Sequence, residues 1–162
     1  MSKTLFLVRH AEAEEPANHL KDRDRVLTPT GRRDATRLGN YFAEEDIMPD
    51  IIMSSTAVRA INTAEIIAER VKYNIDRIEQ NEDLYEASVR ILLKAINELP
   101  NDTKKVLMVA HNPGITFLAD YLTVEDIGGM AAGTLITLKL DLEDWSQVSQ
   151  HTANIKIIRS PD

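Results

Sequence analysis

Two short apolar runs constrain the fold of this chain more than any other feature. Thr4 to Val8 and Val106 to Ala110 are uncharged throughout, and each follows a lysine. Continuous apolar runs of this length, without polar alternation, are typical of strands buried on both faces of a parallel sheet. Such a sheet needs helices on both of its faces. The two runs therefore predict an α/β fold.

Helical patterns alternate with the apolar runs. Thr28 followed by Pro29 predicts a helix start, because threonine caps helices and proline is favoured at the first helical position. Further helices are expected over 57–71, after Ser88 and over 114–122. Further strands are expected at 51–53, 75–78, 134–142 and 155–158. The order predicts an α/β sandwich with a largely parallel sheet, antiparallel where the last two strands lack a helix between them.

Length and composition are those of an ordinary globular protein. The 162 residues suggest one domain over 1–162. The 26 acidic and 19 basic side chains give a net charge of −7, which argues against nucleic acid bound by bulk charge. The absence of cysteine excludes disulfide scaffolds, thiolate zinc sites and cysteine nucleophiles. No apolar stretch reaches the roughly 18 residues of a membrane span, and the first residues do not resemble a signal peptide, so we expect a cytoplasmic protein.

Histidine and arginine follow three of the expected strands. Arg9 and His10 come directly after the first strand, and His111 comes directly after the strand that ends at Ala110. Arg59 falls in the first or second turn of the helix that follows the strand at 51–53. Ligands of open α/β sheets bind beyond the carboxyl ends of the strands, so we expect these four side chains to converge.

This combination of residue types favours a phosphoryl group as the ligand. Arginine forms bidentate, charge-assisted bonds to phosphate oxygens, and helix N-termini add N–H donors. A histidine beside two arginines has its cationic form disfavoured, so we expect His10 to be neutral and able to attack phosphorus. A single histidine after a strand is more often a hydrogen-bonded loop residue. The prediction therefore depends on all four side chains occurring together.

Four segments resemble motifs of the histidine phosphatase superfamily. Leu7 to Ala13 resembles its Arg-His-Gly motif, and Leu27 to Gly31 resembles its Leu-Thr-x-x-Gly segment. Ser54 to Ala64 resembles its Ser-x-x-x-Arg-Ala-x-x-Thr-Ala segment, and Ala110 to Pro113 carries the second histidine. The motifs follow the family order over about residues 3–122. The short chain resembles the SixA-type phosphohistidine phosphatase branch.

The resemblance implies a fold, a mechanism and a set of residue roles. The implied fold is a three-layer α/β/α sandwich around a mostly parallel, mixed sheet. His10 is the implied nucleophile: it takes up phosphate as phosphohistidine, which water then hydrolyses, with no metal and no organic cofactor. The residues implied to hold the phosphoryl group are Arg9, Arg25, Arg59, His111 and Asn112.

Two departures from the family pattern bear on the activity. Ala11 stands in place of the motif glycine, as it does in the short-chain branch. Ala13 and Pro16 stand where larger members carry further phosphate-binding residues. The second departure argues against a mutase.

The general acid for ester hydrolysis has several candidates. Larger members use a Glu or Asp after the third strand, and Leu84-Tyr85-Glu86 resembles that pattern. Glu86 is therefore the first candidate, with Glu82 and Asp83 as alternatives. A surface position at the approach to a helix explains Glu86 equally well. Phosphohistidine does not require this acid, because its leaving nitrogen protonates readily.

Three functions are consistent with these residues. The leading hypothesis is a metal-independent phosphatase that acts on phosphohistidine of a protein. The alternative within the same class is a small-molecule phosphomonoester phosphatase with Glu86 as its general acid. A non-catalytic phosphate-binding module is disfavoured, because the nucleophile and its implied partners are all present. A dinucleotide-binding protein would need a glycine-rich first turn, which this chain lacks.

Other conspicuous residues have simpler explanations. Glu12 and His19 lie in the most polar segment, which is expected to form a loop near the end of the first strand. His151 lies in a polar turn and is assigned no role. Residues 128–133 are expected at the rim of the pocket, and Trp145 is expected to pack at an edge.

Overall fold

The computed structural model describes residues 2–161 and contains a six-stranded sheet with the strand order β3-β2-β4-β1-β5-β6. Its strands are β1 Lys3–Arg9, β2 Ile51–Ser54, β3 Glu79–Gln80, β4 Lys105–Ala110, β5 Leu135–Leu140 and β6 Ala153–Arg159. The first four strands run parallel, whereas β5 and β6 pair antiparallel. The mixed, mostly parallel sheet is confirmed.

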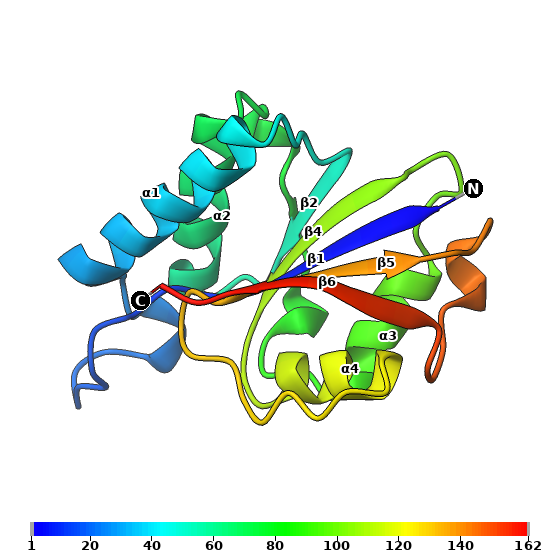
Figure 1. Cartoon of the computed structure of the whole chain (residues 1–162). Helices are drawn as coiled ribbons and strands as arrows, with labels where there is room; N and C mark the ends of the chain where they lie inside the picture. Colours follow the sequence, from blue (N-terminus) through cyan, green and yellow to red (C-terminus); the bar gives the residue numbers. More distant parts are fainter. Residues whose placement is uncertain (1, 162) are drawn as a thin grey trace.

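Helices cover both faces of this sheet. They are α1 Pro29–Glu44, α2 Val58–Arg70, α3 Val89–Asn97 and α4 Gly114–Leu122. Helices α1 and α2 lie on one face and α3 and α4 on the other, which makes the three-layer sandwich (Figure 1). Short 3-10 turns join these elements: η1 Asp22–Asp24, η2 Ile75–Arg77, η3 Glu82–Leu84 and η4 Trp145–Gln147. Among residues 2–161, no helix is long and apolar enough to cross a membrane.

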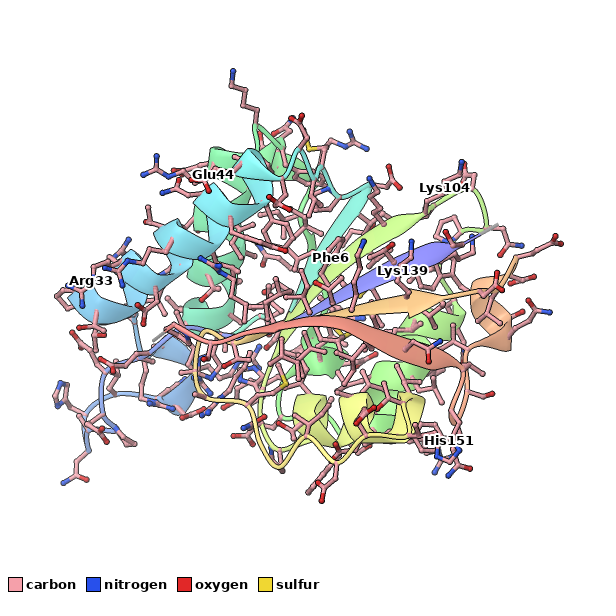
Figure 2. All side chains as sticks on the ribbon, in the orientation of Figure 1. Phe6, Arg33, Glu44, Lys104, Lys139 and His151 are labelled. Atoms are coloured by element: carbon pink, nitrogen blue, oxygen red, sulfur yellow. The ribbon has the colours of Figure 1, made fainter. Side chains whose placement is uncertain are left out.

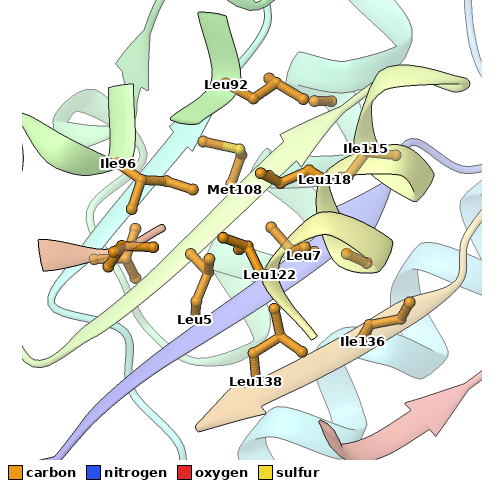
Figure 3. Packing of buried hydrophobic residues seen from close by; sticks show 14 of the residues in the cluster. Leu5, Leu7, Leu92, Ile96, Met108, Ile115, Leu118, Leu122, Ile136 and Leu138 are labelled. Carbon is orange, nitrogen blue, oxygen red and sulfur yellow. The ribbon is translucent and has the colours of Figure 1, made fainter. Parts of the chain in front are cut away.

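The continuous apolar sequence of β1 follows from its two covered faces. Phe6 and Val8 pack in the cluster with α1 and α2, and Phe6 lies 5.1 Å from the ring of Phe42 in α1 (Figure 2). Leu5 and Leu7 point to the opposite face and pack with α3 and α4 (Figure 3). Because successive strand side chains alternate between faces, the residues of β1 between its charged ends, Lys3 and Arg9, have no position for a charge.

Helix starts agree closely with the sequence, and one strand does not. The Thr28 side chain caps α1 by accepting a hydrogen bond from the Gly31 N–H at 3.0 Å. The strand expected at 75–78 is wrong, because this segment forms η2 and the strand β3 begins only at Glu79. The Asn74 side chain accepts the N–H of Asp76 and so stabilises a turn where the apolar pattern had indicated a strand.

Trp145 is buried completely, so the expected position at an edge is wrong. It lies in η4 between β5 and β6 and packs into the cluster under α3 and α4. Its indole N–H donates to the carbonyl of Thr103 at 2.8 Å. The hydrogen bond satisfies the one polar group of the ring and so permits complete burial.

Two glycines near helix starts let α1 and α4 lie in close contact with the backbone of neighbouring segments. A Cβ on Gly31 would lie 2.1 Å from the carbonyl oxygen of Glu12. A Cβ on Gly114 would lie 2.0 Å from the carbonyl oxygen of Ala87. Real Cβ atoms do not approach backbone oxygens so closely, so these positions require glycine. They hold the starts of α1 and α4 against the segments that follow β1 and precede α3.

We expect Gly114→Ala to destabilise the fold by about 1–3 kcal/mol, because the added methyl group must displace backbone at Ala87. Gly129→Ala is the matched control, since a Cβ there meets no atom within 4 Å. Urea denaturation of both variants checks this prediction. An equal free energy of unfolding for Gly114→Ala and the wild type would contradict it.

Candidate active site

A pocket of about 330 Å³ lies beyond the carboxyl ends of β1, β2 and β4. It is lined by Arg9, His10, Glu12, Ala13, Asp22, Arg25, Arg59, Glu86, His111, Asn112 and Ala132. All seven site residues expected from the sequence are in this set. The structure thus brings them together from segments that are far apart along the chain.

His10 follows β1 directly, and only 8% of it is exposed. Its Nδ1–H donates to the carbonyl of Ala11 at 2.8 Å. The Nε–H of Arg59 points to His10 Nε2 at 3.4 Å. A neutral imidazole with its proton on Nδ1 therefore has the lone pair of Nε2 on the side of Arg59.

The protonation of His10 is set mainly by burial. Burial lowers its pKa to about 4, helped by the positive charges of Arg59, Arg9 and Arg25 and opposed by the hydrogen bond to Ala11. A low dielectric and neighbouring cations both disfavour the imidazolium form. His10 is therefore neutral near pH 7, as the sequence predicts.

His111 follows β4 and lies beside His10, with 5.2 Å between the ring centroids. Its Nε2 is 2.7 Å from the hydroxyl oxygen of Ser55, which also accepts the N–H of Ala57 at 3.3 Å. If the Ser55 hydroxyl donates to Nε2, the proton of neutral His111 is on Nδ1. Burial, then His10 and Arg59, lower its pKa to about 3.

Two buried nitrogens of the pocket residues have no hydrogen-bond partner among residues 2–161: Arg9 Nε and His111 Nδ1. Arg9 is anchored by Nη1, which donates to the carbonyl of Met130 at 2.9 Å, and burial together with Arg59 lowers its pKa. An unpaired buried polar group costs about 1–3 kcal/mol. Oxygens of a bound anion are the partners that would satisfy two such donors.

Thr63 connects the segment after His10 to helix α2. Its hydroxyl accepts the N–H of Ala11 at 3.0 Å and donates to the carbonyl of Arg59 at 2.8 Å. Thr63 therefore positions Ala11, the residue whose carbonyl accepts the hydrogen bond from His10. The sequence analysis gave this threonine no role, although its place four residues after Arg59 puts both on one helix face.

Asp22 lines the pocket and Tyr85 contacts Asp22, and neither is predicted from the sequence as a site residue. The Asp22 carboxylate lies 3.0 Å from Arg59 Nη2 and 2.9 Å from Arg25 Nη2. It also accepts a hydrogen bond from the Tyr85 hydroxyl. This bond, followed by those from Arg59 and Arg25, lowers the pKa of Asp22 to about 2 against the effect of burial. Burial and Asp22 raise the pKa of Tyr85.

The polar segment 12–25, which carries Asp22, is fixed to its surroundings at several points. Ala13 pairs with Leu27 in an isolated bridge. Arg23 donates to a carboxylate oxygen of Glu82 at 2.8 Å and to the hydroxyl of Thr56. The guanidinium of Arg23 also lies 4.9 Å from the ring centroid of Tyr85. The segment therefore forms one wall of the pocket.

The remaining candidates differ in how close they lie to the pocket. Glu86 lines it and is exposed, whereas Glu82 is paired with Arg23 outside it. The amide of Asn112 donates to the carbonyl of Met130 at 2.9 Å and accepts from Thr116. Its contacts therefore position the 128–133 segment, of which Ala132 reaches the pocket as expected for a rim.

The other two histidines lie elsewhere. His19 is exposed in the 12–25 segment and does not line the pocket. His151 lies in the turn before β6 and does not line the pocket (Figure 2). Among residues 2–161, no three or more His, Cys, Asp or Glu side chains are grouped so that they could hold a metal ion.

Comparison with known families agrees with the motifs. The model of the histidine phosphatase superfamily (branch 1) matches residues 5–92. The chain belongs to this superfamily, which confirms the family that the motifs indicated. An Uncharacterized protein ML1117 of Mycobacterium leprae (strain TN) is 30% identical over 135 residues, 80% of each chain. A 2,3-bisphosphoglycerate-dependent phosphoglycerate mutase of Nocardioides sp. is 42% identical over 66 residues, which are 40% of this chain and 27% of the mutase.

Solved structures resemble the chain over almost its whole length. A candidate phosphohistidine phosphatase SixA from Nakamurella multipartitia is 26% identical, with a TM-score of 0.82 over 99% of this chain and 97% of that one. The protein histidine phosphatase SixA complexed with tungstate is 20% identical, with a TM-score of 0.83 over 98% and 97%. At 20% identity, the similarity to the second structure shows only that the two proteins share a fold. Both agree with the sandwich that the motifs implied.

We expect the free energy of unfolding to fall as the pH is lowered from about 6.5 to about 4. The unfolded chain binds protons on His10 and His111 in this window, whereas their folded-state pKa values of about 4 and about 3 keep them neutral. His10→Gln should reduce this slope, and His19→Gln should not. Urea denaturation between pH 4.5 and 7 measures it. Equal slopes for His10→Gln and the wild type would overturn the expectation.

Proposed function

We propose that this chain is a phosphatase that forms a phosphohistidine intermediate on His10 and removes phosphate from phosphohistidine on a protein. Membership of the histidine phosphatase superfamily supports the class of reaction. The chemistry of the pocket supports the nucleophile. That the substrate is phosphohistidine on a protein is the more specific part of the proposal.

The orientation of the His10 ring is the observation that carries the proposed nucleophile. Its Nδ1–H is committed to the carbonyl of Ala11, so the unprotonated Nε2 is left to attack. The Nε–H of Arg59 lies 3.4 Å from that nitrogen, close enough to bind an oxygen of a group attached to it.

The proposed reaction has two steps. In the first, His10 Nε2 attacks phosphorus, the P–N bond of the substrate breaks, and the leaving imidazole takes up a proton from solvent. In the second, water attacks phosphorus, the bond to His10 breaks, and inorganic phosphate leaves while His10 returns to its neutral form. Donors from Arg9, Arg59 and His111 stabilise the charge that spreads over the phosphoryl oxygens.

Two observations support a phosphohistidine substrate. A phosphoramidate needs no carboxylic acid near its leaving nitrogen, and the buried part of the pocket around His10 is lined by arginine and histidine. The similar protein of Nakamurella multipartitia is described as a candidate phosphohistidine phosphatase.

A second candidate function is hydrolysis of a small phosphomonoester. Glu86 lines the same pocket as His10 and is exposed, so its carboxyl could protonate an ester oxygen. In that case Glu86 would be the general acid and the substrate would carry its phosphate on oxygen.

We expect phosphate release from a histidine-phosphorylated carrier domain to depend on His10. His10→Ala should slow single-turnover release by a factor of about 1000 or more, because no other group replaces the nucleophile. His19→Ala, an exposed histidine outside the pocket, is the matched control and should retain the wild-type rate. The assay contains a chelator throughout. Rapid release by His10→Ala would refute the assignment of the nucleophile.

Glu86→Gln separates the two substrate classes. If the substrate is a phosphomonoester, loss of the general acid should slow hydrolysis of an alkyl phosphate by about 100-fold or more. Under the phosphohistidine proposal, the same variant should keep its rate on the phosphorylated carrier within about twofold, as should Asp83→Asn. A faster wild-type rate on the alkyl phosphate than on the carrier would favour the phosphomonoesterase.

A further inference from the structure

The Asp22 carboxylate contacts the same guanidinium groups that a phosphoryl group would use. Asp22 belongs to η1, and its side chain is 40% exposed. One carboxylate oxygen lies 3.0 Å from Arg59 Nη2, and the other lies 3.0 Å from Arg25 Nε. The pocket therefore contains an anion supplied by the chain itself.

Asp22 contacts two of the three nitrogens of each guanidinium group. Arg59 Nη1 donates to the Asp22 carbonyl at 2.8 Å and Nη2 to its carboxylate, whereas Nε faces His10. Arg25 directs Nε and Nη2 to the Asp22 carboxylate and Nη1 to the carbonyl of Glu14. An incoming phosphoryl oxygen must share these donors or displace the carboxylate.

We propose that Asp22 is an intramolecular competitor of phosphate, which neutralises Arg59 and Arg25 in the pocket and so weakens the binding of free inorganic phosphate. The inference rests on the proposed function only in assuming that this pocket binds phosphoryl groups. Its consequence for the reaction is easier release of the product.

The geometry separates the charge of Asp22 from its positioning of Arg59. The main-chain carbonyl of Asp22 holds Arg59 Nη1 whatever the side chain is. The Tyr85 hydroxyl and Arg59 Nη2 share one carboxylate oxygen of Asp22, and the amide oxygen of asparagine can take its place. The amide NH2 then faces Arg25, so asparagine removes the negative charge and the contact to Arg25. Asp22→Asn is therefore expected to change the electrostatics of the pocket and to leave the orientation of Arg59 intact.

The sign of the expected effect follows from Coulomb repulsion. Two anions that contact one guanidinium lie on the order of 5 Å apart, and in a partly exposed site their repulsion weakens binding of a phosphate dianion by roughly tenfold. Removing the carboxylate removes this repulsion. Asp24 lies in the same turn, is exposed and does not line the pocket. Asp24→Asn is therefore the matched control, because it changes the net charge by the same amount as Asp22→Asn without changing the pocket.

Titration calorimetry of the full chain with inorganic phosphate at constant ionic strength tests the proposal. We expect Asp22→Asn to bind phosphate about tenfold more tightly than the wild type, and Asp24→Asn to bind it within twofold of the wild type. A thermal melt of each variant checks that the fold is retained.

Equal or weaker binding by Asp22→Asn overturns the proposal, and weaker binding would make Asp22 a positioning residue for Arg59. The absence of saturable phosphate binding in every protein also overturns it. Hydrolysis of the phosphorylated carrier by the wild type is measured separately. If the wild type does not hydrolyse the phosphorylated carrier but Asp22→Asn binds phosphate more tightly, the proposed function is rejected and the role of Asp22 as a competitor stands. If the wild type hydrolyses the carrier but Asp22→Asn does not bind phosphate more tightly, only the role of Asp22 is rejected.

Discussion

The candidate site depends on one electrostatic constraint: an imidazole must stay neutral among three guanidinium groups. Burial and the charges of Arg59, Arg9 and Arg25 act in the same direction on His10, and both lower its pKa. The carbonyl of Ala11 then decides which nitrogen keeps the proton. Neither effect alone would present an unprotonated Nε2 to the pocket, because a neutral imidazole has two possible tautomers.

The register of the parallel strands brings the residues of the candidate site together. Arg9 pairs with Ala110, and Ser54 pairs with Val109, so β1, β2 and β4 end at nearly the same level. The residue after each pair therefore emerges at one edge. These residues are His10, His111 and Ser55. A shift of one residue in the pairing of β1 with β4 would turn a side chain to the other face of the sheet and separate the two histidines, and the same shift of β2 would move Ser55 away from His111.

The same register explains which parts of the site the sequence could predict. His10 and His111 directly follow buried strands, and Arg59 lies in the first turn of α2, so a pattern of local segments suffices to find them. Asp22 and Tyr85 meet only because the chain folds back over 63 residues of separation, and nothing in either neighbourhood indicates the partner. The segment 75–78 was misjudged for a related reason: its apolar pattern competed with turn chemistry at Asn74.

The pocket does not recognise an anion through net positive charge. Its lining carries three guanidinium groups and three carboxylates: Arg9, Arg25, Arg59, Glu12, Asp22 and Glu86. A phosphate dianion would therefore enter a formally balanced site in a chain of net charge −7. What distinguishes this site is its buried nitrogens without a hydrogen-bond partner among residues 2–161: Arg9 Nε and, where the Ser55 hydroxyl donates to Nε2, the Nδ1–H of His111. Both belong to neighbours of the proposed nucleophile His10. Under the proposed function, donors that are fixed in this way need no reorganisation when charge develops on the phosphoryl oxygens, so they would stabilise the transition state more than other anions.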